Sequence, residues 1–464
     1  MQLFNSMTRK KEEFVPLKEG HVGIYVCGPT VYNLIHIGNA RPLVVYDTLR
    51  RYLEYRGYSV TFVQNFTDVD DKMIKRANED GCTVADIADK YIPEYYNDSH
   101  AMHVRDATIC PRATKHIKEI IKLVSQLIEA GHAYVSDNGD VYFSVRSYPA
   151  YGKLSGQSIE SLESGARVDP TEHKHDPLDF ALWKAEKPNE PSWDSPWGKG
   201  RPGWHIECSA MSMKVLGETF DIHAGGVDLL FPHHENEIAQ SEAATGKPFA
   251  RYWMHNGHIN VNNQKMSKSL GNFFWVRDIL KDYDADVLRL FFLFAHYRSP
   301  LNFSRELMDQ AQSALERIRT TKLRISGAIV SSTPNEKEEK EFLGAIDEYR
   351  QRFIRAMDDD LNTADALGIL FEYIRAANTF VTAQRSKAAI EAADQFLEEL
   401  IGILGISTAE KAVDFPDEAI ALLEQRTAAR KVKDWARADA IREELKNMGF
   451  AIEDSPKGPI LKKI

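Results

Sequence analysis

The sequence predicts an α/β protein in which a doubly wound parallel-sheet domain with an insertion precedes an all-α bundle and a small C-terminal α/β domain. Two observations support this fold class. Short apolar runs alternate with helical patterns in the first half of the chain, which is typical of a parallel sheet covered by helices. From about Tyr283 onward, apolar residues recur at helical spacing instead, which indicates a helical bundle.

The first elements follow each other as strand, helix, strand and helix. Residues 22–26 are predicted as an apolar strand and residues 40–55 as a helix that stops before Gly57. Residues 59–66 are rich in β-branched and aromatic side chains, as strands are. A further helix is expected to begin at Asp68, with acidic residues in its first turn.

An insertion is predicted over residues 130–200. It follows an amphipathic helix at 114–131 and contains a hairpin at 132–145 with an Asn-Gly turn. Residues 147–202 show little periodicity and are rich in Gly, Pro, Ser and Trp. Strand character then returns at 219–226, before a helix at 232–245 with Pro232 in its first turn and a strand with a turn at 252–259.

The second half is predicted to be helical. Helices are expected at 341–357, 364–382 and 387–404, with linkers at 331–340 and 406–415, then a helix at 434–448 and a strand and turn at 449–459. The resulting domains are a Rossmann-like domain at 1–129 and 201–250, the inserted connective region at 130–200, a loop-bearing junction at 251–306, a helical bundle at 307–405 and a small domain at 416–464.

Composition restricts the class of protein. The chain has 464 residues with 43% hydrophobic and 27% charged residues, as ordinary globular proteins do, and we expect a cytoplasmic protein without a membrane partner. Its four cysteines favour metal binding, catalysis or burial over a disulfide framework. The net charge is −10, but residues 425–464 carry ten basic and six acidic residues, which is typical either of an end that faces a polyanion or of a solvated helical face.

The stretch from residue 25 to residue 42 is a candidate nucleotide site. A strand ends at Gly28-Pro29, and a helix follows His36-Ile37-Gly38-Asn39, so free backbone N–H groups and a positive helix end can face a phosphate. His36 can donate to that phosphate, and Gly38 lets a purine or ribose approach the backbone. A helix start with an incidental histidine is the alternative interpretation.

A second candidate is Lys265-Met266-Ser267-Lys268-Ser269. Two ammonium groups three residues apart could close over a triphosphate and stabilise a leaving pyrophosphate. An ordinary exposed basic turn would look the same.

Together, the two motifs resemble the paired signature of class I aminoacyl-tRNA synthetases, in the same order and 229 residues apart. Further segments narrow the resemblance to the bacterial cysteinyl-tRNA synthetase family over essentially the whole chain. These segments are residues 25–32, 203–209, 225–237 and 359–363.

The resemblance implies one Zn²⁺ per subunit, with Cys27, Cys208, His233 and Glu237 as its ligands. Two thiolates, an imidazole and a carboxylate suit zinc, and residues 233 and 237 would share one face of the predicted helix. The spacing alone instead favours two buried cysteines and a helix-cap histidine. His234 is the nearest rival to His233, and Cys82 and Cys110 are expected to be structural.

The implied reaction has two steps. Cysteine and ATP form cysteinyl-adenylate and pyrophosphate, and the cysteine then passes to the terminal adenosine of tRNA(Cys). His36 and Asn39 would contact the ATP phosphates beside Gly38, Lys265 and the more critical Lys268 would contact the pyrophosphate, and Mg²⁺ would accompany ATP. Asn39 departs from the family's usual histidine; its amide donates hydrogen bonds but cannot become cationic.

The same resemblance implies a pocket for L-cysteine. Zinc would hold the substrate as a thiolate and reject serine, so no editing domain would be needed. Trp204 is expected to wall this pocket, with Thr67 and His223 as secondary candidates.

The bundle and the C-terminal domain are expected to bind tRNA, including its anticodon, in a monomeric protein. A surface for phosphates and bases is predicted at Arg426, Arg430, Lys431, Lys433, Trp435 and Arg437. Solvated arginines around a packed tryptophan are the alternative. Two other functions remain open: a ligase that joins cysteine to an amino sugar, which would not need this extension, and a non-catalytic tRNA-binding paralogue, which would not need intact motifs.

Overall fold

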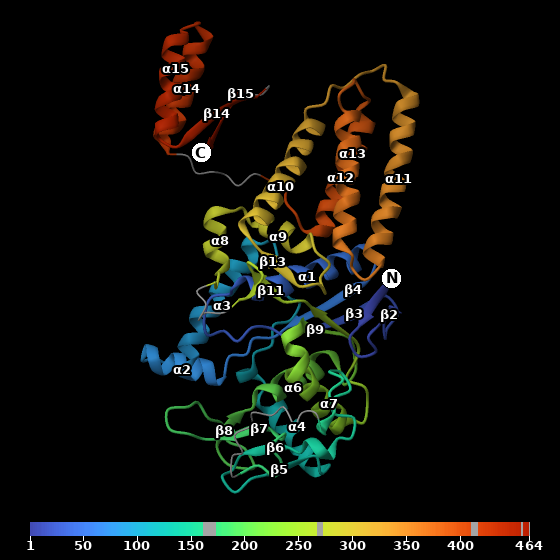
Figure 1. Ribbon diagram of the computed structural model, residues 1–464, viewed down its shortest axis with the longest axis vertical. Helices are drawn as coiled ribbons and strands as arrows, with labels where there is room; N and C mark the ends of the chain where they lie inside the picture. Colours follow the sequence, from blue (N-terminus) through green and yellow to red (C-terminus); the bar gives the residue numbers. More distant parts are fainter. Residues whose placement is uncertain (161–172, 267–271, 410–415, 456–457, 464) are drawn as a thin grey trace. The chain divides into compact units, whose positions relative to one another are not determined.

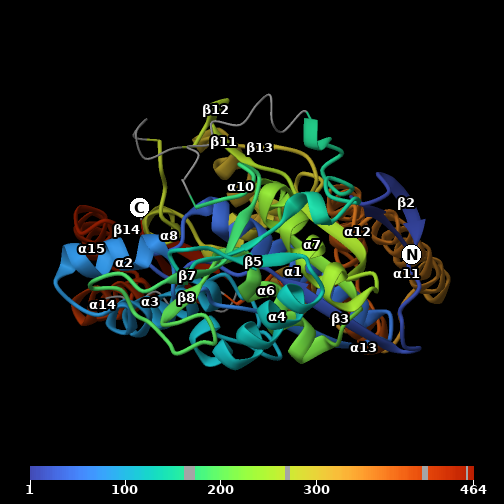
Figure 2. The same cartoon turned by 90° about the horizontal axis from the view of Figure 1, so that it is seen from below.

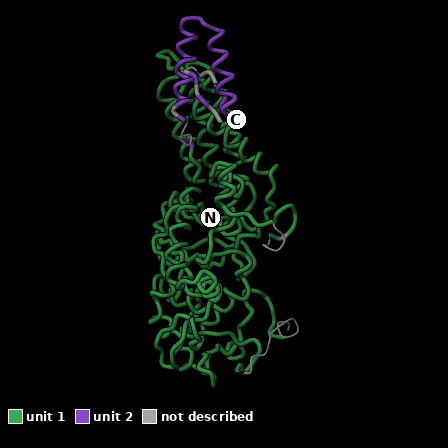
Figure 3. Tube along the Cα trace, turned by 90° about the vertical axis from the view of Figure 1, so that its left-hand side faces the viewer, with its two compact units in different colours: residues 1–407 green, residues 408–464 purple. Residues whose placement is uncertain are grey.

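A computed structural model describes residues 1–160, 173–266, 272–409, 416–455 and 458–463 (Figure 1). The chain forms two compact units, residues 1–407 and residues 408–464, which Figure 3 distinguishes by colour. We describe each unit separately. The finer division into domains stays a prediction.

A parallel sheet forms the centre of unit 1, with the strand order β10–β9–β3–β4. Its strands are β3 (His21–Val26), β4 (Ser59–Gln64), β9 (Phe220–Gly226) and β10 (Ala250–Asn256). This confirms the predicted doubly wound sheet. The chain leaves β3 for β4 on one side and returns to β9 on the other, so a crevice opens at the carboxyl ends of β3 and β9.

Helix α1 (Ile37–Tyr55) covers the sheet and begins three residues before the predicted start, because His36 acts as its N-cap. Helix α2 (Asp71–Asp80) begins later than predicted, because the Asp70 side chain caps its first turn, and α3 (Val84–Ala101) follows. Strand β4 also ends two residues earlier than predicted.

Two small sheets adjoin the central one. The hairpin of β1 (Gln2–Asn5) and β2 (Lys10–Glu13) was not predicted, because both strands have only four residues and β2 is entirely polar. Strand β11 (Ile259–Val261) pairs with both β12 (Gln264–Lys265) and β13 (Leu301–Phe303). Helices α8 (Val276–Asp282) and α9 (Ala285–Leu293) lie between β12 and β13 in the chain.

The inserted region forms an antiparallel sheet in the order β5–β6–β7–β8. The hairpin of β5 (Ala133–Val135) and β6 (Val141–Phe143) confirms the prediction, whereas β7 (Phe180–Ala185) and β8 (Gly200–Pro202) were not predicted. Figure 2 shows α4 (Ile117–Glu129), α6 (Trp204–Leu216) and α7 (Glu235–Thr245) grouped beside this sheet.

Two helices of this region differ from the sequence expectation. Helix α6 was not predicted, because residues 206–212 are all buried and therefore show no amphipathic period. Helix α7 begins at Glu235, so placing Pro232 in its first turn was wrong. Pro232 lies instead in the irregular helical turn Leu230–His234, which follows the turn Val227–Leu229 and precedes the helix.

Four helices form the predicted bundle within unit 1 and lie side by side in Figure 1: α10 (Arg305–Ser326), α11 (Glu336–Asp358), α12 (Thr363–Phe380) and α13 (Lys387–Leu404). Helix α11 begins inside the predicted 331–340 linker. The Asn335 cap and three glutamates in the first turn stabilise this start. Among the helices described, none is long and apolar enough to cross a membrane.

Unit 2 consists of α14 (Asp417–Lys431), α15 (Trp435–Asn447) and the antiparallel pair β14 (Phe450–Ser455) and β15 (Gly458–Lys463). The sequence predicted α15 and the strand but not α14. A small apolar core holds the unit together: Ala419, Leu422, Ile441, Leu445, Phe450 and Leu461.

Candidate active site

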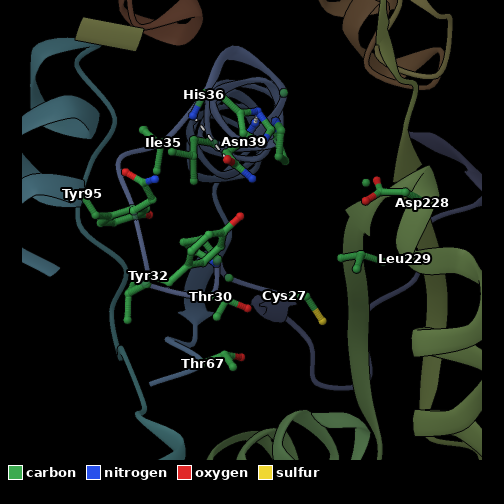
Figure 4. Close-up of a pocket in the computed structure, with 18 of the residues that line it drawn as sticks. Cys27, Thr30, Tyr32, Ile35, His36, Asn39, Thr67, Tyr95, Asp228 and Leu229 are labelled. Atoms are coloured by element: carbon green, nitrogen blue, oxygen red, sulfur yellow. Dashed lines mark hydrogen bonds between the residues drawn. The ribbon is translucent and has the colours of Figure 1, made fainter. Parts of the chain in front are cut away.

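A cavity of about 460 Å³ opens at the crevice between β3 and β9. Its wall includes residues 27–36 after β3, the first turn of α1, and the 256–259 segment between β10 and β11. Figure 4 shows the helix end with His36 and Asn39 in the upper part of the view, Cys27 and Thr67 in the lower part, and Asp228 and Leu229 across the cavity. The predicted nucleotide motif and the first predicted metal ligand therefore face one space.

The N-terminus of α1 is closed by a reciprocal capping box. The Asn39 backbone N–H donates to His36 Nδ1, and the His36 backbone N–H donates to Asn39 Oδ1, each at 3.3 Å (Figure 4). Because the Asn39 oxygen accepts this bond, its amide N–H₂ group is the part that can donate to a ligand. The asparagine thus stabilises the helix end that points at the cavity.

Gly38 lies where no side chain fits. A Cβ there would lie 2.8 Å from His36 Cε1 and 3.2 Å from Met266 Cε. The first motif therefore packs against Met266 of the second motif.

The four predicted metal ligands converge. The ligand atoms of Cys27, Cys208, His233 and Glu237 all lie within 4.8 Å of one another. Cys27 Sγ lies 3.8 Å from Cys208 Sγ and 3.4 Å from Glu237 Oε1, and His233 Nε2 lies 3.0 Å from that same oxygen. This donor set can hold a divalent cation.

A rival donor set shares two of these residues. Cys27 and Glu237 also lie within 4.8 Å of ligand atoms of His223 and His234. His234 is fully buried, and its Nδ1 lies 2.8 Å from His255 Nε2. His233 and Cys208 line the cavity, whereas His223 and His234 do not, so a ligand in the cavity can reach the first set.

The charges of this buried cluster favour cation binding. Burial alone would raise the pKa of Glu237, but His223 and His233 lower it to about 2. The hydrogen bond with Cys27 lowers the pKa of Cys208 to about 6, while burial keeps the pKa of Cys27 high. Burial would lower the pKa of His233, but Glu237 and Cys208 raise it to about 10. A cation would displace the remaining protons as it binds.

Three further residues were predicted to contact substrate. Trp204 lines the cavity and stacks on His233, with ring centroids 4.3 Å apart, and Thr67 also lines the cavity. His223 does not line it. It is fully buried, and its Nε2 lies 2.9 Å from Glu237 Oε2, so it orients that carboxylate instead.

The second predicted motif is only partly described. Lys265 is placed by the backbone of β12, and Lys268 lies outside the described residues. Met266 of this motif and the chain at residues 273 and 274 both lie against the first motif. The Ile37 N–H donates to Phe274 O at 3.1 Å, and the rings of His36 and Phe273 lie 4.7 Å apart. The structure thus brings together the chain around both motifs.

Comparisons with known proteins cover the whole chain. Residues 13–313 match the catalytic-domain model of class I tRNA synthetases (C), residues 352–408 match a DALR domain, and residues 412–458 match a cysteinyl-tRNA ligase anticodon binding domain. A cysteine–tRNA ligase of Caldicellulosiruptor saccharolyticus is 57% identical over 468 aligned residues, which span 100% of both chains. The chain belongs to the cysteinyl-tRNA synthetase family.

Solved structures agree on the fold. The methionyl-tRNA synthetase of Mycobacterium tuberculosis bound by methionyl-adenylate has a TM-score of 0.59 at 14% identity, covering 82% of this chain and 89% of its own. The leucyl enzyme of Agrobacterium radiobacter K84, in its complex with tRNA, has a TM-score of 0.58 at 11% identity, covering 85% of each chain. This cysteinyl-tRNA synthetase therefore has the class I architecture.

Sequence reasoning missed several polar residues of the cavity of this cysteinyl-tRNA synthetase. Asp228 and Lys72 both line it, and the Lys72 ammonium lies 5.8 Å from the centre of the Tyr32 ring. Asp228 lies in the 225–237 segment that carries the family resemblance, which was the available signal. Lys72 had none, because its position among acidic residues at a helix start is typical of a solvated turn.

The predicted tRNA surface of this synthetase lies in unit 2 and needs one correction. Trp435 is 55% exposed, and the Arg430 guanidinium lies 5.9 Å from its ring centre. Lys431, Lys433 and Arg437 are also exposed. Arg426 is only 6% exposed, so its assignment to an exposed surface was wrong: it lies one turn after Leu422, on the buried side of α14.

Proposed function

We propose that this ligase activates L-cysteine with ATP to cysteinyl-adenylate and pyrophosphate. It then transfers the cysteinyl group to the terminal adenosine of tRNA(Cys) and releases AMP. One observation carries the proposal beyond family membership. The Cys27–Cys208–His233–Glu237 cluster, through its first three members, and the capped N-terminus of α1 line the same cavity. A thiol held at the first and a triphosphate held at the second would meet in that space.

The proposed metal is Zn²⁺, one per chain. Two thiolates, one imidazole and one carboxylate are typical zinc ligands, and the four donor atoms converge within 4.8 Å. When bound, zinc supplies a Lewis acid that favours the thiolate of cysteine over the hydroxyl of serine. Trp204 and Thr67 would enclose the rest of the amino acid.

The chain itself handles the nucleotide by position and charge. The N-terminus of α1, with His36 and the Asn39 amide, would donate hydrogen bonds to the ATP phosphates, and Gly38 gives the nucleotide room. The cysteine carboxylate attacks the α-phosphate and the pyrophosphate leaves. Lys265, Lys268 and Mg²⁺ would neutralise that leaving group. A cytoplasmic monomer stays the prediction from the sequence.

ATP–pyrophosphate exchange tests the proposal. We expect exchange with cysteine, far less with serine, and charging of tRNA(Cys) by the same preparation. Lack of exchange with cysteine would contradict the proposal. Exchange without charging of tRNA would favour the ligase that joins cysteine to an amino sugar. Charging of tRNA without added cysteine would show that the preparation contains contaminating cysteine.

Trp435→Ala should weaken tRNA binding without affecting cysteine activation. Stacking of one base on an aromatic ring contributes about 1–3 kcal/mol, so the KM for tRNA should rise while pyrophosphate exchange stays unchanged. Trp435 is exposed and flanked by Arg430, which suits a base beside a phosphate. Trp435→Phe retains a stacking face and is the matched control. Equal losses in both variants would indicate that the ring does not stack on RNA.

A further inference from the structure

Arg41 is a fully buried arginine five residues after His36 on α1. Its Nη1 donates to Gly257 O at 2.8 Å and His258 O at 3.0 Å, and its Nη2 donates to Ser299 O at 2.7 Å and His296 O at 3.4 Å. All four acceptors are backbone carbonyls. They come from two loops far apart in the sequence.

Packing alone does not account for a charge at this position. A buried cation is costly, and a hydrophobic residue of similar size would fill the space at lower cost. Burial lowers the pKa of Arg41 only to about 10, so the guanidinium stays charged at neutral pH. Arg289 is equally buried, but its charge is paired with the Asp47 carboxylate, whereas the hydrogen bonds described for Arg41 go to backbone carbonyls. The rigid fork of Arg41 instead joins two loops.

One of those loops is a wall of the cavity. Residues 256–259 line the cavity, as does the end of α1 that carries His36 and Asn39. They also lead through β11 into β12, which carries Lys265. Arg41 thus donates hydrogen bonds to the segment that connects this wall of the cavity to the second motif.

The other loop supports the first from behind. Gly257 N–H donates to Tyr297 O at 2.8 Å, and Leu301 N–H donates to His258 O at 2.9 Å. A Cβ at Gly257 would lie 2.5 Å from Ser299 O and 2.7 Å from Arg298 O. Several carbonyls therefore crowd together here, and the Arg41 charge offsets their mutual repulsion.

We infer that Arg41 is a positioning residue for ATP, which sets the 256–259 wall at a fixed place relative to the N-terminus of α1. The inference rests on the proposed function, because it takes the nucleotide to lie between these two parts. Arg41 does not line the cavity and acts only through the loops that it holds.

Arg41→Lys tests this inference by pyrophosphate exchange. A lysine keeps the charge but offers a single compact donor group that cannot bind both loops in the same fork. We expect the KM for ATP to rise about tenfold or more, because small misplacements of a binding wall have effects of this size. The KM for cysteine and the metal content should stay unchanged. Arg289→Lys is the matched control: we expect a lower melting temperature with an unchanged KM for ATP.

Gly257→Ala disturbs the same contact from the loop and keeps the test valid if Arg41→Lys is poorly soluble. It should raise the KM for ATP in the same way, and the double variant should add little. An unchanged KM for ATP in these variants, or equal changes for ATP and cysteine, would overturn the inference while leaving the activity of the unaltered enzyme intact. If the unaltered enzyme shows no exchange, the proposed function fails. The inference is then tested by titrating the unaltered protein and Arg41→Lys with ATP, and it requires that Arg41→Lys bind ATP more weakly.

Discussion

Replacing Cys208 with serine is expected to abolish binding of the proposed Zn²⁺ and to lower kcat/KM for cysteine by more than about 100-fold, the upper end of the effect of losing a residue that only supports a metal ligand. Cys208 is buried, its Sγ lies 3.8 Å from Cys27 Sγ, and its pKa of about 6 makes it the more readily ionised of the two thiols. A serine hydroxyl does not ionise at neutral pH, so the site would lose an anionic ligand.

The measurements are metal content by elemental analysis and steady-state pyrophosphate exchange with cysteine and ATP varied in turn. The KM for ATP should change little, because the α1 end that faces the nucleotide is built without Cys208. Cys82→Ser is the matched control, since Cys82 is exposed and should tolerate the change. An unchanged affinity for cysteine in Cys208→Ser would refute the selective role of the metal.

Replacing Asp47 with alanine should lower the free energy of unfolding by about 3–5 kcal/mol, the range for breaking a buried ion pair from one side. Asp47 is buried in α1 and binds the fully buried Arg289 of α9; it also accepts from Arg51 Nε at 2.7 Å. Without this carboxylate, the hydrogen bonds of Arg289 among the described residues are to the Thr48 hydroxyl and to the backbone carbonyls of Met102 and Leu404. Chemical denaturation of unit 1 measures the loss.

The loss of unfolding free energy in Asp47→Ala should depend on pH, in a direction that the pKa of Asp47 determines. Burial alone would raise the pKa of Asp47, but Arg289 and Arg51 hold it below the ordinary value. A carboxyl group with a depressed folded-state pKa stabilises the fold above its unfolded pKa of about 3.9, and this contribution is lost as the pH falls through the folded value. The difference between Asp47→Ala and the unaltered chain should therefore be largest near neutrality and shrink below about pH 4.

Asp80→Ala provides the control for this prediction. Asp80 pairs with Arg76 on α2, and both side chains are 31% exposed, so the loss should stay below about 1 kcal/mol. A similar loss in both variants, or a loss in Asp47→Ala that does not shrink in acid, would contradict the role assigned to the buried pair.

The sequence by itself determined the parts that depend on local patterns. Alternating apolar strands and helices predicted the parallel sheet, helical spacing predicted α12 and α13, and the Gly-Pro break before His36 predicted the change from strand to helix. These features succeed because each leaves a signal within about ten consecutive residues.

Elements that are stabilised mainly by distant contacts were missed. Helix α6 is buried on all sides along residues 206–212, so no period marks it. Strands β7 and β8 are recognisable only by their pairing with the hairpin at 133–143. Helix α7 begins later than its proline suggested, because irregular turns at 227–234 carry His233 towards the cluster.

The site shows the same division. The resemblance to the family named Cys27, Cys208, His233 and Glu237, whereas their spacing alone favoured ordinary burial. Only the folded chain places those four donor atoms within 4.8 Å, moves His223 from the substrate pocket to the Glu237 carboxylate, and joins Arg41 to carbonyls more than 200 residues away in sequence. Such contacts depend on which segments the sheet and its crossovers bring together, and local sequence patterns do not specify that arrangement.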